Sequence, residues 1–325
     1  MYLGSGKLMD KSRLEERLGR IRILNYGFMF LAAIAALAGC GDRRSGKPLN
    51  VRVGYVDSGN IYIVDKDGGN IKQITSNGAD SYPVFHPLNK KDIAFSRDNS
   101  TGTETELWVT DALGNERQVT YFGATYFGAR TMQADWNDMG DKLAVSTTYL
   151  TGVNHIATVD LNGNIVDIVA EDSQYEYFHP VWVGSEVTYE ESDGRAGNLH
   201  MSTENGTFLG SLTNSSAGRN TEPKATYDGK KILWSHQEVP FGRTIWEMNW
   251  GDFSGTTARA VTPVGIGAPY FWNPAPNPMN PNEFVAISDK DGTPQVYLEN
   301  IVTGEETVLP NTQNVKHLDF GFFAE

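Results

Sequence analysis

The stretch "IYIVDKDGGNIKQIT", residues 61–75, places two short apolar runs on either side of a polar turn. Gly68 and Gly69 can supply the positive φ that a tight hairpin turn needs. A turn this rich in Asp and Gly also resembles a calcium loop or a nucleotide-binding loop. A site would occur once or twice in the chain, whereas a structural unit would recur, so its recurrence decides between the two.

The turn recurs through the whole chain. A similar turn closes at six glycines that lie 46, 49, 43, 49 and 49 residues apart, namely Gly68, Gly114, Gly163, Gly206, Gly255 and Gly304. A short β-rich run precedes each turn and a second run follows it. Recurrence at a fixed period is typical of repeat architectures. The segment is therefore a building block of the fold and not a binding loop.

Two further runs complete each repeat. A candidate innermost strand begins at residues 83, 134, 180, 223, 269 and 318, and a second strand follows a short turn, as in "DIAFS" and "KILWS". Four antiparallel strands in about 45 residues make the blade of a β-propeller. The sequence therefore predicts an all-β, six-bladed β-propeller of four-stranded antiparallel blades over residues 51–325. A pair of β-sandwiches or an open solenoid is the alternative fold.

One repeat is split between the two ends of the chain. The run at 318–322 has no partners after it, while residues 51–75 hold three strands without an innermost one. Joining them predicts a ring closed by one C-terminal and three N-terminal strands, which removes two exposed sheet edges. Neither alternative fold explains this split.

The N-terminal segment is typical of export. Residues 1–39 carry six Lys or Arg ahead of the apolar stretch "FMFLAAIAALAG", which is too short to span a bilayer as a mature helix. The segment ends in Leu37-Ala38-Gly39-Cys40, which resembles the lipobox of bacterial lipoproteins, and Cys40 is the only cysteine. We expect residues 1–39 to be a signal peptide, Cys40 to carry a lipid, and residues 40–50 to form a short linker. The alternative is a lone structural cysteine.

The location follows from the same residues. A lipidated Cys40 would anchor the protein in the cell envelope, facing the periplasm or the cell surface, without a mature transmembrane helix. Gly41 stands where inner-membrane lipoproteins of enteric bacteria carry Asp, so the outer membrane is favoured over the inner membrane.

Charge and motifs narrow the range of functions. The chain has a net charge of −13, which becomes −16 for residues 40–325. Such a surface repels polyanions, and no Lys/Arg cluster offers a basic patch, so no nucleic-acid partner is predicted. The sequence contains no P-loop, nucleophile elbow or zinc-ligand spacing. The Asp-rich turns near Asp65 and Asp289 lack the terminal carboxylate of a calcium loop. We therefore predict no cofactor and no metal.

The candidate site lies at the predicted channel. His179 and His317 directly precede innermost strands, and the equivalent positions elsewhere are Tyr82, Gln133, Glu222 and Ala268. Equivalent blades would bring these side chains around one face of the channel. Four more candidates are expected in loops just outside, so the full predicted binding set is Tyr82, Gln133, Arg130, Tyr177, His179, Arg219, Glu222, Lys316 and His317. His, Tyr and Glu around one pocket could act as general acids and bases. Polar residues beside a channel can also simply face water.

Two further expectations concern packing and surface. The aromatic residues that recur two positions after each innermost strand begins should fill the wedges between blades: Phe85, Trp136, Trp182, Phe271 and Phe320. Ala225 interrupts this series, and Trp234 could pack in its place.

Residues 271–282, "FWNPAPNPMNPN", are rich in Pro and Asn and predict a surface loop that could contact a partner. Substituting the channel residues is expected to cost little stability, within about 0.5 kcal/mol.

Residues 81–98, "SYPVFHPLNKKDIAFSRD", and 221–237, "TEPKATYDGKKILWSHQ", resemble the repeat of TolB-like propellers, as does the stretch at 61–75. The resemblance covers residues 51–325 blade by blade and implies the architecture; related repeats also occur in peptidase propeller domains and polysaccharide lyases. TolB itself has an α/β domain before its propeller, whereas only residues 41–50 separate Cys40 from the first strand here. The chain thus resembles the family and not TolB itself.

Two functions follow as hypotheses. The first is a lipid-anchored bacterial envelope propeller that acts as a non-enzymatic protein-binding or scaffold module and docks an envelope protein at its mouth. The second is an exported polysaccharide-active enzyme, a lyase that uses the same mouth. The acidic chain and the missing metal motif favour the first, so enzymatic activity is the less expected outcome.

Overall fold

The computed structural model describes residues 51–325 except 90, 112, 126–127, 149–152, 216–217, 239–241, 265–267 and 323–325. The predicted signal peptide (1–39) and the predicted linker with Cys40 (40–50) lie outside the described residues. In the described part, the chain forms 24 strands and one short helix, α2 (Phe122–Thr125).

The strands form six groups of four along the described chain, which we number as blades. Blade one contains β4 (Asp80–Phe85), β5 (Ile93–Asp98), β6 (Thr105–Thr110) and β7 (Glu116–Gln118). Blade two contains β8 (Thr131–Trp136), β9 (Lys142–Thr147), β10 (His155–Asp160) and β11 (Ile165–Ala170). Blade three contains β12 (Glu176–Val183), β13 (Glu186–Ser192), β14 (Gly197–Thr203) and β15 (Phe208–Ser211).

The second half of the chain continues this order. Blade four contains β16 (Gly218–Ala225), β17 (Lys231–Glu238), β18 (Gly242–Asn249) and β19 (Arg259–Ala260). Blade five contains β20 (Phe271–Pro276), β21 (Glu283–Ser288), β22 (Gln295–Asn300) and β23 (Glu306–Val308). Blade six joins the two ends of the propeller, with β24 (Leu318–Phe322), β1 (Val51–Asp57), β2 (Asn60–Asp65) and β3 (Lys72–Gln73).

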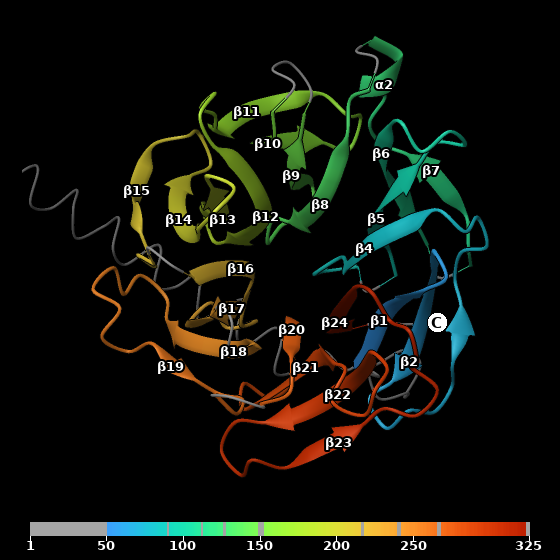
Figure 1. Cartoon of the computed structure of the whole chain (residues 1–325). Helices are drawn as coiled ribbons and strands as arrows, with labels where there is room; N and C mark the ends of the chain where they lie inside the picture. The colour runs from blue at the N-terminus through green and yellow to red at the C-terminus, as the bar shows by residue number, and fades with distance from the viewer. Residues whose placement is uncertain are drawn as a thin grey trace, which may run out of the picture. The chain divides into compact units, whose positions relative to one another are not determined.

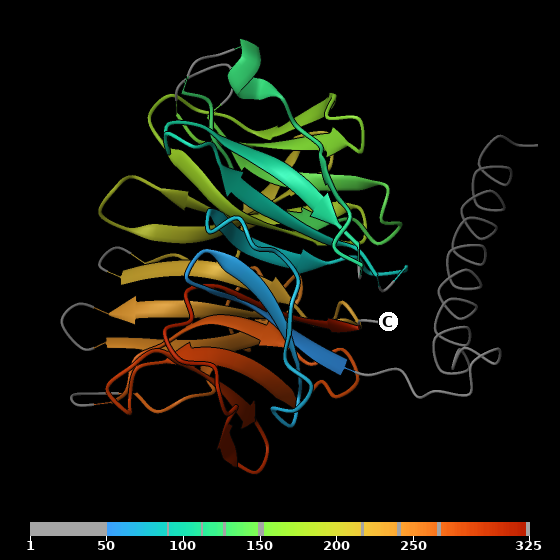
Figure 2. The same ribbon diagram turned by 90° about the vertical axis from the view of Figure 1, so that its right-hand side faces the viewer.

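Each blade is an antiparallel sheet whose first strand lies nearest the centre of the ring, as Figure 1 shows for β4, β8, β12, β16, β20 and β24. A single parallel bridge between Gly197 and Arg219 joins the sheets of blades three and four. In Figure 2, which turns the ring on its side, the strands run across the thickness of the ring. The predicted all-β propeller of four-stranded blades is confirmed.

The ring closes between the two ends of the propeller. β24 pairs antiparallel with β1, and the register places Val53 opposite Phe320 and Tyr55 opposite Leu318. The N–H of Val56 also donates to the carbonyl oxygen of His317 at 2.9 Å. The predicted closure by one C-terminal and three N-terminal strands is therefore confirmed.

The core lies in wedges between neighbouring blades. Phe85, Trp136, Trp182 and Phe320 are each less than a tenth exposed and occupy one common position of the innermost strand, as predicted. In blade four this position is Ala225, and the fully buried Trp234 packs nearby with Met201 and Met248.

Blade five departs from the predicted register. β20 runs over Phe271–Pro276, so the strand includes residues that were predicted to form a loop, and only residues 277–282 form the turn. Pro276 therefore stands where the other blades place the wedge aromatic. Phe271 is fully buried at a different position, with its ring centroid 6.3 Å from that of Tyr297. Phe271 packs between blades as predicted, with Leu233 and Ile245 of blade four, but it does not occupy the strand position that the other aromatic residues share.

Candidate functional site

The innermost strands share a backbone irregularity that aims one side chain at the centre. In blades one to five the pairing of the first two strands shifts at the same point. A residue with positive φ stands at each shift: Tyr82 (50°), Gln133 (45°), His179 (49°), Glu222 (55°) and Asn273 (52°). This conformation costs about 1 kcal/mol or more for a residue with a Cβ. A bulge of this kind re-aims the bulged side chain.

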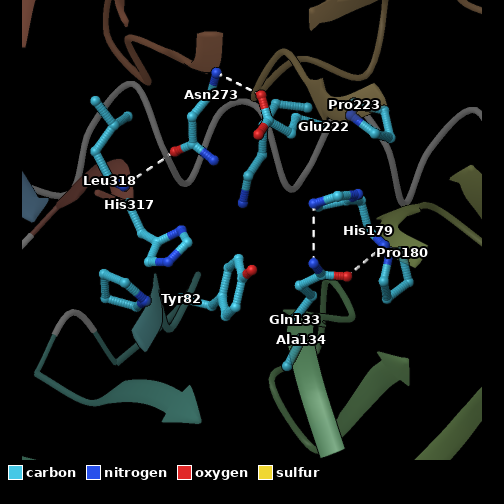
Figure 3. A pocket seen from close by; sticks show the side chains of 12 residues that line it. Tyr82, Gln133, Ala134, His179, Pro180, Glu222, Pro223, Asn273, His317 and Leu318 are labelled. Atoms are coloured by element: carbon cyan, nitrogen blue, oxygen red, sulfur yellow. Dashed lines mark hydrogen bonds between the residues drawn. The ribbon is translucent and has the colours of Figure 1, made fainter. Parts of the chain in front are cut away.

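These five side chains and His317 of blade six, one from each blade, are among the twelve residues that line one cavity of about 40 Å³ (Figure 3). We call Tyr82, Gln133, His179, Glu222, Asn273 and His317 the mouth ring. The sequence placed five of the six correctly at the channel. Ala268 was the wrong choice for blade five, because β20 begins later than expected and the bulge falls at Asn273.

The four candidates expected just outside the ring divide into different environments. Tyr177 is not at the mouth: β12 begins at Glu176, so Tyr177 lies inside a strand, is 5% exposed and packs against Tyr189 at 5.6 Å between ring centroids. Burial raises the pKa of its hydroxyl. Arg130 is half-buried and donates to the carbonyl oxygen of Gly102 at 2.7 Å. Lys316 is exposed beside the ring.

Arg219 belongs to a buried network that holds the ring in place. Glu190 of β13 is fully buried and accepts hydrogen bonds from Arg219 Nε at 2.6 Å and Thr221 Oγ1 at 2.5 Å. His179 Nδ1 lies 3.0 Å from the same carboxylate. Burial alone would raise the pKa of Glu190, but the bond from His179 and the charge of Arg219 hold this pKa below its usual value. Glu190 thus ties blade three to blade four directly behind the mouth.

The hydrogen bonds around His179 determine its tautomer. Its backbone N–H donates to Gln133 Oε1 at 2.9 Å, so the other end of the amide, Nε2, is a donor. Gln133 Nε2 lies 2.9 Å from His179 Nε2, which must then accept. His179 Nδ1 donates to the carboxylate of Glu190. The ring is therefore a neutral imidazole whose two nitrogens both have protein partners.

Polar side chains also bond blade four to blade five and blade five to blade six. Glu222 Oε2 accepts from the backbone N–H of Asn273 at 2.7 Å, and Asn273 Oδ1 accepts from the N–H of Leu318 at 2.9 Å (Figure 3). Glu222 Oε2 also accepts from Ser235 Oγ at 2.7 Å. These bonds fix the positions of the ring side chains relative to one another.

A second layer lies two residues further along each innermost strand, on the same face. It contains three charged residues from alternate blades, Asp135, Lys224 and Asp319. Lys224 Nζ lies 3.5 Å from Asp319 Oδ1. Burial raises the pKa of Asp135 to about 6, although the charge of Lys224 and a 2.8 Å bond from the Trp182 N–H oppose this rise. Asp319 accepts the N–H of Phe85 at 2.9 Å, so this layer also links blades.

The opposite side of the ring is aromatic. The rings of Tyr82 and His317 lie 3.8 Å apart between centroids, and Tyr82 meets His179 edge-on at 6.4 Å. Burial, together with the nearby His179 and Lys316, lowers the pKa of His317 to about 3, so its imidazole is neutral at physiological pH. The cavity thus combines an aromatic wall of Tyr82 and His317 with the polar groups of Gln133 and Glu222.

Sequence reasoning missed the residues behind the ring. Glu190 had a signal in the repeats: it stands in "EVTYE" where three other repeats end in Ser96, Ser146 and Ser235. Asn273, Lys224 and Asp319 occupy regular repeat positions but became visible only with the register of the innermost strands. In the described ranges, no group of three or more His, Cys, Asp and Glu side chains is arranged to hold a metal. A membrane-spanning helix is likewise not found among those residues.

Comparison with known proteins adds the following findings. No protein-family model and no curated protein matches the sequence. TolB from Acinetobacter baumannii matches the fold with a TM-score of 0.67 and 16% identity, over 86% of this chain and 69% of that one. A candidate TolB from Agrobacterium tumefaciens has a TM-score of 0.62 and 14% identity, over 86% of this chain and 100% of that one. An oligogalacturonate lyase from Vibrio parahaemolyticus has a TM-score of 0.52 and 12% identity, over 81% of this chain and 80% of that one.

These likenesses agree with the repeats, with the closed ring and with the almost complete absence of helix in the described chain. Their low sequence identity is consistent with a protein that is not TolB itself. The chain has the fold of the TolB-like β-propellers.

Proposed function

We propose that this protein is a lipid-anchored propeller of the bacterial cell envelope that binds another envelope protein at its mouth ring and has no enzymatic activity of its own. The observation that carries the proposal is the ring itself: six side chains, one from each blade, meet in a cavity of about 40 Å³. The TolB-like fold supports a protein-binding propeller.

The size of the cavity limits what can enter it. A space of about 40 Å³ admits a few waters or one small side-chain group, and the Lys224–Asp319 layer lies behind it. A protein that lies across the mouth and inserts a single side chain would fit. Because Gln133, His179, Glu222 and Asn273 are already hydrogen-bonded to protein groups, a partner would meet a rigid surface, which lowers the entropic cost of binding.

The alternative function is a polysaccharide lyase that uses the same mouth. The similarity of fold to an oligogalacturonate lyase favours it. Three observations speak against it. The cavity is too small for a sugar ring, both nitrogens of His179 already have protein partners, and Lys224 is flanked by Asp135 and Asp319. Protein binding is therefore the function that the geometry supports better.

The location is part of the proposal. The lipobox-like sequence ending at Cys40 supports a lipid anchor, and Gly41 favours the outer membrane. We expect Cys40→Ala either to leave the protein as an unprocessed precursor or to release it from the membrane fraction. Fractionation and mass spectrometry of the mature N-terminus would measure this. A variant that is processed and sediments with membranes like the parent would rule out lipidation at Cys40.

Binding at the mouth can be tested at two ring residues, Tyr82 and His317; the Tyr82 hydroxyl has one side-chain hydrogen bond to a neighbouring blade, to Gln133. Tyr82→Ala and His317→Gln remove aromatic wall without freeing a backbone N–H. We expect each variant to bind the captured envelope protein at least about tenfold more weakly, as is typical of substitutions at the centre of an interface. Cross-linking in the native envelope would identify the partner, and titration with that purified partner would measure the dissociation constant.

Controls make this experiment specific. Tyr121→Ala removes an exposed tyrosine, 58% accessible, outside the ring and should leave affinity unchanged. Wild-type affinity in both ring variants, with melting temperatures near the parent, would contradict docking at the mouth. A polysaccharide panel assayed in parallel tests the alternative: turnover that disappears in His179→Ala would establish the lyase instead.

A further inference from the structure

A second cavity lies between blades three and four, away from the mouth ring. Its volume of about 340 Å³ is at the lower end of the roughly 300–1,000 Å³ range of small-molecule sites. It is walled by the end of β15 and the residues that follow it (211–215), by β16, β17 and β18, and by the loop 253–258. Its lining residues are Ser211, Leu212, Thr213, Asn214, Ser215, Asn220, Trp234, His236, Trp246, Phe253, Ser254, Gly255 and Ala258. We call it the side pocket.

Aromatic rings supply the apolar part of the side pocket. Trp246 is half-buried, and its Nε1 donates to Thr244 Oγ1 at 2.9 Å, so the indole offers its face and not its polar atom. Trp234 lies beside it at 6.2 Å between ring centroids, and His236 meets it edge-on at 5.2 Å. Phe253 adds a second exposed ring, 45% accessible.

The polar part of the side pocket consists of hydroxyls and amides. None of its lining residues, all in the described part of the chain, is Asp, Glu, Lys or Arg, although the chain has a net charge of −13. Asn214 is exposed, and no hydrogen bond joins its side chain to another described residue. Ser211, Thr213 and Ser254 also line the pocket. Thr213 Oγ1 accepts the N–H of Leu199 at 2.8 Å and Ser254 Oγ donates to Asp252 Oδ1 at 2.5 Å, so the amide of Asn214 is the main polar group that a ligand would meet.

A buried amide fixes the histidine in the side pocket. Trp234 Nε1 can only donate, and it bonds Asn220 Oδ1 at 2.9 Å, so this oxygen is an acceptor. His236 Nδ1, 2.8 Å from the same oxygen, must then donate. Asn220 thus holds the indole of Trp234 and the imidazole of His236 in fixed positions, and the aromatic wall of the pocket is rigid.

We propose that the side pocket binds an uncharged saccharide of one or two sugar units. A pyranose has an apolar C–H face that packs on an indole and a rim of hydroxyls that both donate and accept, and the pocket offers both complements. An anionic sugar would lack a cationic partner here. A purely apolar peptide side chain would cover the exposed amide of Asn214 without pairing it, which is costly.

The other blades supply a matched comparison for Trp246. The register pairs Trp246 with Trp234 in blade four and Trp108 with Phe95 in blade one, so the two tryptophans occupy equivalent positions. In blade one the guanidinium of Arg97 covers the indole, 4.7 Å from its centroid. In blade four the residue at the position of Arg97 is His236, whose ring centroid lies 5.2 Å from that of Trp246, and the indole of Trp246 also lines the cavity.

The test is titration of the purified propeller with glucose, galactose and N-acetylglucosamine, with disaccharides of each, and with galacturonate, followed by tryptophan fluorescence and calorimetry. We expect at least one neutral sugar to bind and galacturonate to bind at least tenfold more weakly. Trp246→Leu should weaken binding of the neutral sugar at least tenfold, and Asn214→Ala should weaken it several-fold. Trp246→Phe, which keeps a ring, should lose less than the leucine variant, and Trp108→Leu and Tyr82→Ala should have no effect.

Several outcomes would overturn the inference. One is no binding of any neutral sugar at tens of millimolar by a protein that melts normally. Another is equal loss of binding in the two leucine variants, which would place the sugar elsewhere. Tighter binding of galacturonate, or binding of free indole without any sugar, would show that the assigned ligand class is wrong. Because Tyr82→Ala separates the two sites, each result is independent of docking at the mouth.

Discussion

Deletion of residues 316–325 is expected to leave a chain that no longer unfolds cooperatively. The deletion removes β24, which supplies the innermost strand of blade six and pairs with β1. Leu318 and Phe320, 2% and 6% exposed, leave the wedge that they fill with Val53 and other residues. Burial of two such side chains stabilises a fold by about 3–6 kcal/mol. Whole domains are stable by about 5–15 kcal/mol.

The deletion also breaks bonds to both neighbouring blades. Asp319 Oδ2 accepts the N–H of Phe85, and the N–H of Leu318 donates to Asn273 Oδ1. Without β24, the edge of β1 is exposed and invites association with other chains. We therefore expect a broad, low-temperature melt and aggregation, measured by calorimetry and light scattering.

Two controls qualify this result. Phe320→Ala should cost about 3–5 kcal/mol and yet keep a single cooperative transition, because β24 still pairs. A synthetic peptide of residues 316–325, added to the truncated protein, should restore the transition. A truncated protein that melts as one sharp transition near the parent temperature would show that the ring does not depend on this closure.

The repeats made the fold predictable because they carry two signals at once. Glycine turns at a near-constant interval give the number of blades, and the unpaired runs at 51–75 and 318–322 give the closure. The bulge follows from the same period: in four blades the residue before the expected innermost strand is the one with positive φ, as for Tyr82 and His179. Local pattern was enough to find the mouth ring in those blades.

Blade five shows where local pattern failed. "FWNPAPNPMNPN" reads as a loop because proline interrupts strand pairing. In the structure Pro274 falls within the bulge, between Trp272 and Ala275, where the ladder is already interrupted, and Pro276 ends the strand. Pro274 is thus tolerated because the bulge already interrupts the hydrogen-bond ladder at its position, and the position of the bulge is set by the strand register. The error moved the expected ring position from Asn273 to Ala268.

The contacts between blades could not be predicted in the same way. Glu190 contacts Arg219 and Thr221, which lie 29 and 31 residues later in the chain. The repeat shows that Glu190 stands where three other repeats have serine, but it does not reveal which residues Glu190 contacts. The same limit applies to Tyr177, whose burial depends on Tyr189 in the next strand.

Glu190→Ala is expected to lower the free energy of unfolding by about 3 kcal/mol or more. Removing one partner of a buried ion pair typically costs about 3–5 kcal/mol. Glu190 is fully buried, and its loss leaves His179 Nδ1 and Thr221 Oγ1 without their acceptor. Arg219 is 42% exposed and regains water, which places the cost at the lower end of the range. Denaturant unfolding at neutral pH measures it.

The same variant reports on the mouth ring itself. His179 is held between Glu190 and Gln133, so without the carboxylate the imidazole loses its fixed tautomer, which nitrogen NMR of the histidine ring would detect. Glu191→Gln is the matched control: the neighbouring carboxylate lies 3.7 Å from His200 and bonds the hydroxyl of Tyr177, away from the mouth ring. The amide keeps an acceptor for that hydroxyl, so this change should cost less than about 1 kcal/mol. A Glu190→Ala cost below 1 kcal/mol would show that Glu190 does not hold the blades together. An unchanged His179 spectrum would show that the mouth ring is rigid for another reason, since Gln133 alone would then be sufficient to orient the imidazole.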